Sequence, residues 1–478
     1  MLSQTPASPR TIRWISVGTF AIFALLFATT YDYLPWLKYD WGFNLLRYPP
    51  ELLGWLITGT AGLVVFAETR EGLLRAGRAL SGALSAWSET RRNLLVFGVA
   101  FSLLLLCRER LLLGDSQLLL SLLSQDQKWL YPQPGGLLLL QILFDLSPKL
   151  GLRPVLTYQV LQCGAGAAAV VFVLLAARLA LPGQRTAYGV PLLVFSGGLF
   201  AAIAGRFDTE TLAVCASAGY LWLALRYQRG SGGLALPALA FGFAAWLQPL
   251  CLFAAPGLLW LPRLAGRRYR LTLALALLPL LLHTAQLFAF VARPVPTAKL
   301  LTHAWIGAQG WLRTGGSGPS LGTDYVLLSA PHLKYLLNAA FVLTPAGLPI
   351  AATALLLRRK AALVSRAARF VTASTAGLIV GSLALRPVWG PFDWDLFAVT
   401  GLWIGFLGAI LLAGLEARAL RNHVAVAAVG LQLCFVALPL VAIAQGASHE
   451  GGVFERSHFD SRLARPGRRP PKHIARWL

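Results

Sequence analysis

Long uncharged stretches of Leu, Ala, Val and Phe recur along the whole chain, and short segments between them hold most of its charges. The stretches are too long, and too uniformly apolar, for the alternating strands of a membrane barrel. A membrane-crossing helix needs roughly 20 apolar residues, and somewhat fewer where the bilayer is thin. The pattern therefore predicts an all-α, polytopic transmembrane bundle of about 13 spans. The expected spans are 14–30, 52–67, 93–107, 155–177, 187–204, 211–225, 233–247, 250–262, 271–292, 336–357, 370–385, 396–415 and 423–444.

The stretch 233–262 decides the topology, because it fits either one long helix or two short ones. A single helix would be about 45 Å long, against a hydrocarbon core of about 30 Å. Gln248-Pro249 lies at its middle, where proline should break a helix. We therefore expect a hairpin, which keeps the basic segment 263–270 on the same side as the other basic clusters.

Composition agrees with a lipid-embedded chain. The 478 residues are 56% hydrophobic and 13% charged, whereas soluble domains carry roughly 25% charged residues. The net charge of +23 might suggest nucleic acid, but the basic residues occur in small clusters between apolar spans. That distribution follows the positive-inside rule. We therefore expect the lipid bilayer, and not nucleic acid, as a partner. The five cysteines lie in or beside apolar spans and form no CxxC pair, so we interpret them as core residues.

The basic clusters predict an N-terminus on the inner side of the cell membrane. The expected inner segments are 1–13, 68–92, 178–186, 226–232, 263–270, 358–369 and 416–422. Their only acids are Glu68, Glu71, Glu89 and Glu416. The first apolar run fits a cleaved signal peptide or a retained span, and we favour a retained span because it lacks a small-x-small cleavage site. The basic tail, residues 446–478, is expected outside, and it is the weakest point of this topology.

Two long outer segments are expected, at 108–154 and 293–335. The first has apolar patches at 117–123 and 137–147, which we interpret as helices lying in the membrane interface.

Three groups of acids stand at the outer ends of spans. They are Asp115 after the third span, Asp208 and Glu210 before the sixth, and Asp393 and Asp395 before the twelfth. Carboxylates at apolar helix ends lose water, which raises their pKa and suits a general base. Grouped carboxylates also bind divalent cations such as Mg²⁺ or Mn²⁺. The alternative is that the positive-inside rule simply leaves acids in outer loops. Glu109, between Arg108 and Arg110, is interpreted as an ion-paired surface acid.

Two of these segments resemble sequence motifs of a known family. Gly114-Asp115-Ser116-Gln117-Leu118-Leu119, followed by Trp129-Leu130-Tyr131-Pro132-Gln133-Pro134-Gly135, resembles the first-loop motif and return helix of the GT-C superfamily. These membrane glycosyltransferases include the protein O-mannosyltransferases and the aminoarabinose transferases. Asp393-Trp394-Asp395-Leu396-Phe397 resembles a motif of uncharacterised bacterial members. The likeness covers roughly residues 93–445, and its motifs are short and degenerate.

The resemblance implies a catalytic core over residues 93–445, preceded by two additional helices and a basic inner loop in 1–92. It implies a polyprenyl-phosphate-linked sugar donor, an acceptor on the outer face, and Asp115 as the catalytic base of an inverting reaction. Many members have two adjacent acids in this loop. Here Ser116 follows Asp115, which puts a two-acid metal site in doubt, and Asp208 and Glu210 are the candidates for missing ligands.

A lipid-linked phosphate needs cations near the interface. The expected phosphate ligands are Arg110, Lys128, Arg206, His332, Lys334 and Arg386, for which the alternative is ordinary contact with lipid headgroups. Trp389 and Trp394 are candidates for stacking on the sugar.

The competing hypothesis is a transporter or flippase for a lipid-linked or polar solute. Transporters often have internal repeats, matching broken helices and polar groups at the midplane. No repeat and no matching pair of broken helices is evident in the sequence, so we favour the transferase. A non-catalytic membrane partner would leave the outer acids without a role.

Overall fold

The computed structural model describes residues 56, 59–60, 67–110, 116, 119–120, 123, 134–261, 274–277, 281, 328–362, 365–384, 394–414 and 418–445. Within these residues all regular structure is helical, and no strand occurs. The helices of the first half are α3 (Ala67–Ser85), α4 (Glu89–Leu106), α6 (Pro134–Lys149), α7 (Pro154–Ala180), η4 (Arg185–Gly189), α8 (Val190–Phe195), α9 (Gly198–Ile203) and α10 (Glu210–Gln228). Those that follow are α11 (Ala235–Leu247), η5 (Pro249–Ala254), α12 (Ala255–Trp260), α15 (Ala330–Leu343), α16 (Gly347–Ala362), α17 (Arg366–Ala384), η7 (Trp394–Phe397), α18 (Ala398–Ala413), α19 (Arg418–Gln432), the π-helical turn η8 (Leu433–Ala437) and α20 (Leu438–Ala444).

Four helical stretches in the described part of the chain are long and apolar enough to cross a membrane. They are Pro154–Ala180, Arg366–Ala384, Trp394–Ala413 and Val424–Ala442. The bent pair Tyr335–Leu343 and Gly347–Ala354 would make a fifth if it forms one span. The all-helical fold expected from the sequence is therefore confirmed, and helices suited by length and composition to a membrane are present. The count of about 13 spans stays a prediction, because several of those spans lie outside the described residues.

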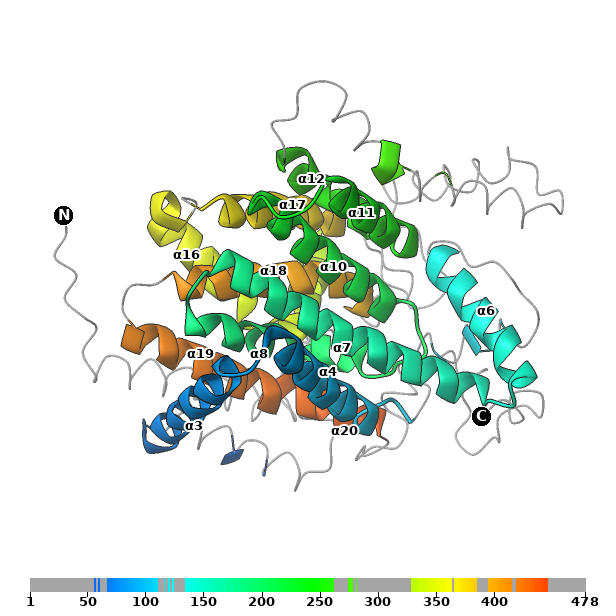
Figure 1. Ribbon diagram of the computed structural model, residues 1–478, viewed down its shortest axis with the longest axis horizontal. Helices are drawn as coiled ribbons and strands as arrows, with labels where there is room; N and C mark the ends of the chain where they lie inside the picture. The colour runs from blue at the N-terminus through cyan, green and yellow to red at the C-terminus, as the bar shows by residue number, and fades with distance from the viewer. Residues whose placement is uncertain are drawn as a thin grey trace.

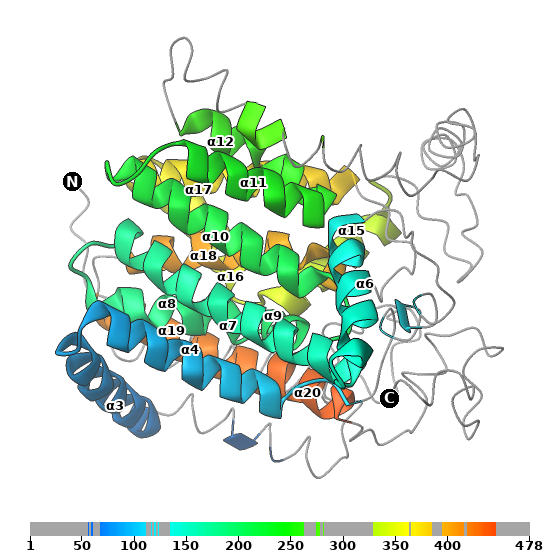
Figure 2. The same ribbon diagram turned by 45° about the vertical axis from the view of Figure 1, so that its right-hand side comes forward.

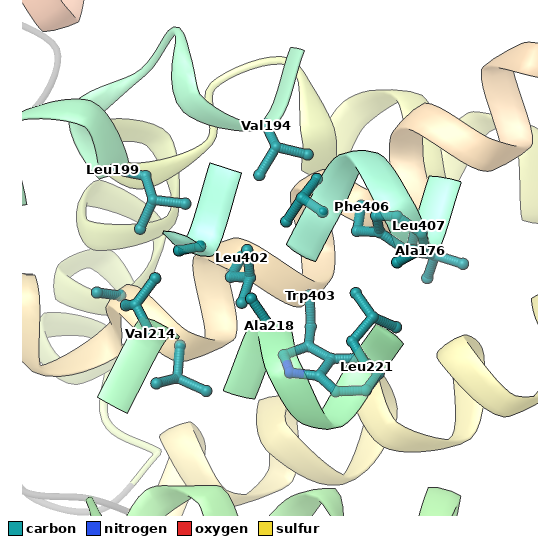
Figure 3. Close-up of a cluster of buried hydrophobic side chains, with 14 of the residues drawn as sticks. Ala176, Val194, Leu199, Val214, Ala218, Leu221, Leu402, Trp403, Phe406 and Leu407 are labelled. Carbon is teal, nitrogen blue, oxygen red and sulfur yellow. The ribbon is translucent and has the colours of Figure 1, made fainter. Parts of the chain in front are cut away.

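Helix α18 is the centre of the bundle, and every one of its residues is buried. Such a helix is apolar on all sides, as its sequence is. Trp403 is fully buried and donates a hydrogen bond from Nε1 to Ser217 Oγ at 2.8 Å. The apolar side chains that pack around α18 come from several helices: Ala176 from α7, Val194 from α8, Leu199 from α9, and Val214, Ala218 and Leu221 from α10 (Figure 3). The surrounding helices therefore all pack against α18.

The long helices α4, α7 and α10 run side by side (Figure 1). Helix α6 stands across their ends (Figure 2) and packs on α7, α10 and α11. Its apolar residues form a second small core with Leu119, Leu120 and Leu123 of the first loop and with Tyr158 and Phe207. The helix expected at 137–147 is therefore present, and it covers one end of the bundle.

Two of the helix breaks have the same local cause. A residue before proline is sterically pushed out of the helical region. Gln248, before Pro249, has φ −144° and ψ 107° and ends α11. Thr344, before Pro345, has φ −149° and ψ 70° and ends α15, after which α16 leaves at a bend of 100°. The predicted break at Gln248-Pro249 is confirmed, and α12 packs back on α11. The span expected at 336–357 is not one straight helix, because it is interrupted at Thr344 and Pro345.

A third break divides the span expected at 187–204. Instead of one helix, the chain forms the short helices α8 and α9, which are separated at Ser196 and Gly197. Gly197 makes room for this arrangement, because a Cβ there would lie 2.8 Å from Leu343 O. The helices α8–α9 and α15–α16 are therefore both interrupted, and they touch at their breaks.

Candidate functional site

Three chain segments meet at the end of the bundle that α6 covers. They are the residues after α4, the connection between α9 and α10, and the turn η7 before α18. Each brings buried acids: Glu109 (3% exposed), Asp208 (1%), Glu210 (7%) and Asp395 (4%). Arg206 lies among them. We call these five residues the Arg206 cluster.

Arg206 joins two of the segments. Its Nη1 forms an ion pair with the carboxylate of Asp395, and its Nε lies 3.4 Å from Asp208 Oδ2. The guanidinium also lies over the ring of Trp394, 5.6 Å from the ring centroid. Burial by itself would lower the pKa of Arg206, but the nearby carboxylates of Asp395 and Asp208 outweigh it and raise that pKa. The guanidinium therefore stays charged in a site that contains little water.

Glu109 is a buried member of this cluster, so its interpretation as a surface acid was wrong. Its Oε2 accepts a hydrogen bond from Ser116 Oγ at 2.8 Å and another from the backbone N–H of Phe207 at 3.3 Å. The first of these bonds fixes the residue that follows Asp115 in the chain. The first loop and the α9–α10 connection are thus tied together through one carboxylate.

Asp208 and Glu210 occupy the start of α10, where the N-terminal end of a helix favours negative charge. Asp208 Oδ1 accepts from the N–H of Glu210 at 3.2 Å, and Glu210 Oε2 accepts from the N–H of Thr209 at 3.1 Å. Burial raises the pKa of Asp208, the charge of Glu210 raises it further, and Arg206 opposes both only in part. Asp208 therefore holds a proton to higher pH than an ordinary aspartate.

A polar side of α7 holds two of the acid-bearing segments in place. The hydroxyl of Tyr158 and Nε2 of Gln162 both donate to the backbone carbonyl of Asp208, the second at 2.5 Å. Nε2 of Gln159 donates to the carbonyl of Glu109 at 2.8 Å. The sequence analysis missed these residues. Their signal was available, because three polar side chains at positions 158, 159 and 162 interrupt an otherwise apolar span.

Two glycines allow the backbone to come close at this site. Gly205 has φ +62°, and a Cβ there would lie 2.8 Å from Arg108 Cβ. Gly136, in the first turns of α6, touches the α9–α10 connection, where an added Cβ would lie 2.5 Å from Thr209 Cβ. Both positions favour glycine for steric reasons.

The expected site residues are brought together only in part. Asp208, Glu210, Asp395 and Arg206 belong to the Arg206 cluster, and Trp394 lies against the guanidinium of Arg206. Asp115, Lys128, Arg386, Trp389 and Asp393 lie outside the described residues, as does the side chain of Lys334.

Among the expected phosphate ligands, Arg110 is exposed just beyond Glu109, and its N–H donates to Ala444 O at 3.1 Å. His332 is buried in the first turn of α15, where Nδ1 accepts from Leu328 N at 3.2 Å. Arg206 is already engaged by two carboxylates. The assignment of a phosphate to these side chains stays a prediction.

No group of three or more His, Cys, Asp or Glu side chains in the described part of the chain is arranged to hold a metal ion. The acids of the Arg206 cluster point to the guanidinium, to Ser116 and to backbone N–H groups instead. Because Asp115 and Asp393 fall outside the described residues, a divalent cation stays a prediction.

Comparison with known proteins adds no family to this description: no protein-family model matches the chain, and neither a curated protein nor a solved structure matches it.

Proposed function

We propose that this chain is an integral membrane glycosyltransferase, which moves a sugar from a polyprenyl-phosphate carrier to an acceptor on the outer face of the cell membrane. The observation behind this proposal is the Arg206 cluster. Acids from three distant segments are buried together at the bundle end where the first loop and α6 lie. Titratable groups in a desolvated environment with defined charge partners are typical of functional sites.

The likeness to the GT-C superfamily supports the choice of reaction. In that superfamily the first long outer loop holds the proposed base and leads to interfacial helices. In this chain Ser116 is tied to Glu109, and the residues just after it pack with α6 in one small core. Ser116, in the loop segment that resembles the family motif, therefore lies at the same end of the bundle as the Arg206 cluster.

The reaction that fits this arrangement is an inverting displacement. A carboxylate accepts the proton of the acceptor hydroxyl, the oxygen attacks the anomeric carbon, and the bond to the lipid phosphate breaks as the phosphate leaves with its electron pair. Asp115 is the proposed base by resemblance, and Glu109 becomes the alternative because it is buried beside Ser116. We leave Arg206 out of the phosphate-binding set, because two carboxylates already balance its charge. Arg110, Lys128, His332, Lys334 and Arg386 remain in it.

A doubly labelled donor tests the proposal. Purified protein in proteoliposomes would receive polyprenyl-phosphate hexoses that carry one label in the sugar and another in the phosphate, together with an extract of envelope acceptors. A transferase separates the two labels, so that the sugar leaves the lipid and the phosphate stays with it. If the labels never separate for any donor, the transferase proposal is wrong.

A transporter or flippase is the second candidate, because one observation favours it. Interrupted helices that meet inside a bundle are a feature of many transporters, and α8–α9 and α15–α16 meet in this way. In the same experiment a flippase would move both labels together across the bilayer. Movement of intact donor without separation of the labels would decide for this candidate.

A further inference from the structure

A single side chain connects the two interrupted helices. Gln432 is 1% exposed and ends α19, directly before the π-helical turn η8. Its Nε2 donates to Leu193 O at 3.0 Å and to Ser196 Oγ at 2.7 Å. Its Oε1 accepts from the N–H of Ala346 at 3.0 Å. The amide nitrogen of Gln432 therefore bonds at the α8–α9 break, and its amide oxygen bonds at the α15–α16 break.

These contacts replace the backbone hydrogen bonds that the breaks remove. In a continuous helix Leu193 O would accept from the N–H of Gly197, and the N–H of Ala346 would donate to Val342 O. Inside a membrane protein a freed backbone group needs another partner, because no bulk water reaches it. Gln432 supplies that partner to α8–α9 and to α15–α16 at the same time.

The two breaks are also in direct contact. A Cβ at Gly198 would lie 2.6 Å from Val342 O, and a Cβ at Gly197 would lie 2.8 Å from Leu343 O and 2.9 Å from Pro345 Cδ. Such close backbone approach leaves little room for one break to open while the other stays closed.

Helix α15 extends from its break to the Arg206 cluster. It packs on η7, where Tyr335 meets Phe397 edge-to-face at 6.0 Å between ring centroids. On its other side Leu333 and Leu337 are exposed, Leu337 at 57%. The helix thus lies between the cluster and the surroundings of the bundle, and its far end is the bend at Thr344 and Pro345.

We propose that Gln432 is a clasp that holds both helix breaks closed, and that α15 turns as a rigid arm about residues 344–346 when the clasp opens. The movement would uncover η7 and the Arg206 cluster from the side. The π-helical turn η8 follows Gln432 directly, and such turns are rare inside α-helices and frequent at functional sites. The proposal does not depend on the reaction at the cluster.

Hydrogen–deuterium exchange in lipid nanodiscs tests the clasp. Gln432→Met keeps the size of the side chain and removes its hydrogen bonds. We expect exchange to rise roughly 10-fold or more in the peptides that cover 344–347 and 196–199 together. Thr375→Val is the matched control, because Thr375 is buried and bonds to Val371 O of its own helix at 2.7 Å and, at 3.5 Å, to Trp403 O of α18, but to neither break. It should leave both peptides unchanged.

Two results would overturn the proposal: a rise at only one of the breaks, or no rise at either. If Gln432→Met does not fold, Ser196→Ala removes one of the three bonds and should give a smaller rise at residues 344–347, across the contact. Unchanged exchange at residues 344–347 in Ser196→Ala would also contradict the clasp.

The arm is tested by the distance between spin labels at Leu337 on α15 and at Leu152 before α7, two exposed positions. A chain without its native cysteines would be used. We expect a second, longer distance to appear in Gln432→Met and not in Thr375→Val. A single unchanged distance in all three proteins would show that α15 does not move.

Discussion

At the scale of single residues, Arg206 determines whether the buried acids are tolerated. Desolvated charges are costly, and removing one partner of a buried pair leaves the other uncompensated. Arg206 contacts Asp208 and Asp395, and both carboxylates are almost fully buried. The residue types of this site were foreseeable from the acids at span ends. That Arg206 would pair with these acids was not, because the sequence does not show which side chains share a low-dielectric space.

Replacing Arg206 should therefore destabilise the fold. We expect Arg206→Met to lower the free energy of unfolding by about 3–5 kcal/mol. The double change Arg206→Met with Asp395→Asn should recover part of that loss, because one unpaired charge is then gone. Thermal unfolding in detergent measures both. If the double variant is less stable than the single one, Asp395 is not charged through its contact with Arg206.

The raised pKa of Asp208 makes a pH-dependent prediction. An acid whose pKa is higher in the folded state binds more protons there, so its contribution to stability is full below the unfolded pKa and is lost as pH rises through the folded pKa. Asp208→Asn imitates the protonated form. We expect the variant to gain stability relative to the parent as pH rises from about 5 to about 9. Melting temperatures across that range check it, and a growing deficit of the variant at high pH would contradict it.

At the scale of elements, the effect of proline on the preceding residue predicted one of two helix breaks. The residue before a proline ends a helix at Gln248 and again at Thr344, but only the first was recognised, because 233–262 was too long for one span. The break at Ser196 and Gly197 contains no proline. It depends on Gln432, which is far away in the chain, and on the close approach of Leu343. Ser196-Gly197-Gly198 was a local signal for a break, but the tertiary contacts that hold the break could not be predicted from local sequence.

Glycine replacements test how closely α6 covers the site. Gly136→Ala should destabilise the protein by about 1–3 kcal/mol, because the added methyl meets Thr209. Gly164→Ala in α7 is the matched control, since a Cβ there has nothing within 4 Å. It should be neutral or stabilise by up to about 1 kcal/mol. Equal melting temperatures for the two variants would show that α6 does not press on the α9–α10 connection.

At the scale of the whole molecule, the acid-bearing segments that were expected on one face do meet at one end of the bundle. The basic residues Arg178 and Arg229 lie at the opposite ends of α7 and α10. Alternation of charge along the chain made this division predictable. The arrangement of helices about α18 was not predictable, because a helix that is apolar on every side does not reveal its neighbours.

Labelling of introduced cysteines tests the orientation. Asp145 on α6 and Arg229 after α10 are both exposed. Helix α6 packs against Thr209 at the start of α10, whereas Arg229 follows the other end of that helix. In intact cells a membrane-impermeant thiol reagent should label a cysteine at 145, and should label one at 229 only after the membrane is permeabilised. Labelling of both from the same side would contradict the proposed topology.

Sugar transfer by the acids at and beside the Arg206 cluster is tested by the turnover rate of Asp115→Asn. The measurement uses proteoliposomes and the doubly labelled donor, with Asp145→Asn as the control, since Asp145 is an exposed acid of α6 that Gln141 binds. We predict that Asp115→Asn lowers the rate of label separation by about 10²–10⁴-fold, while Asp145→Asn keeps the parent rate. If Asp115→Asn and Glu109→Gln both separate the labels at the parent rate, the acids of this site are structural and do not perform sugar transfer.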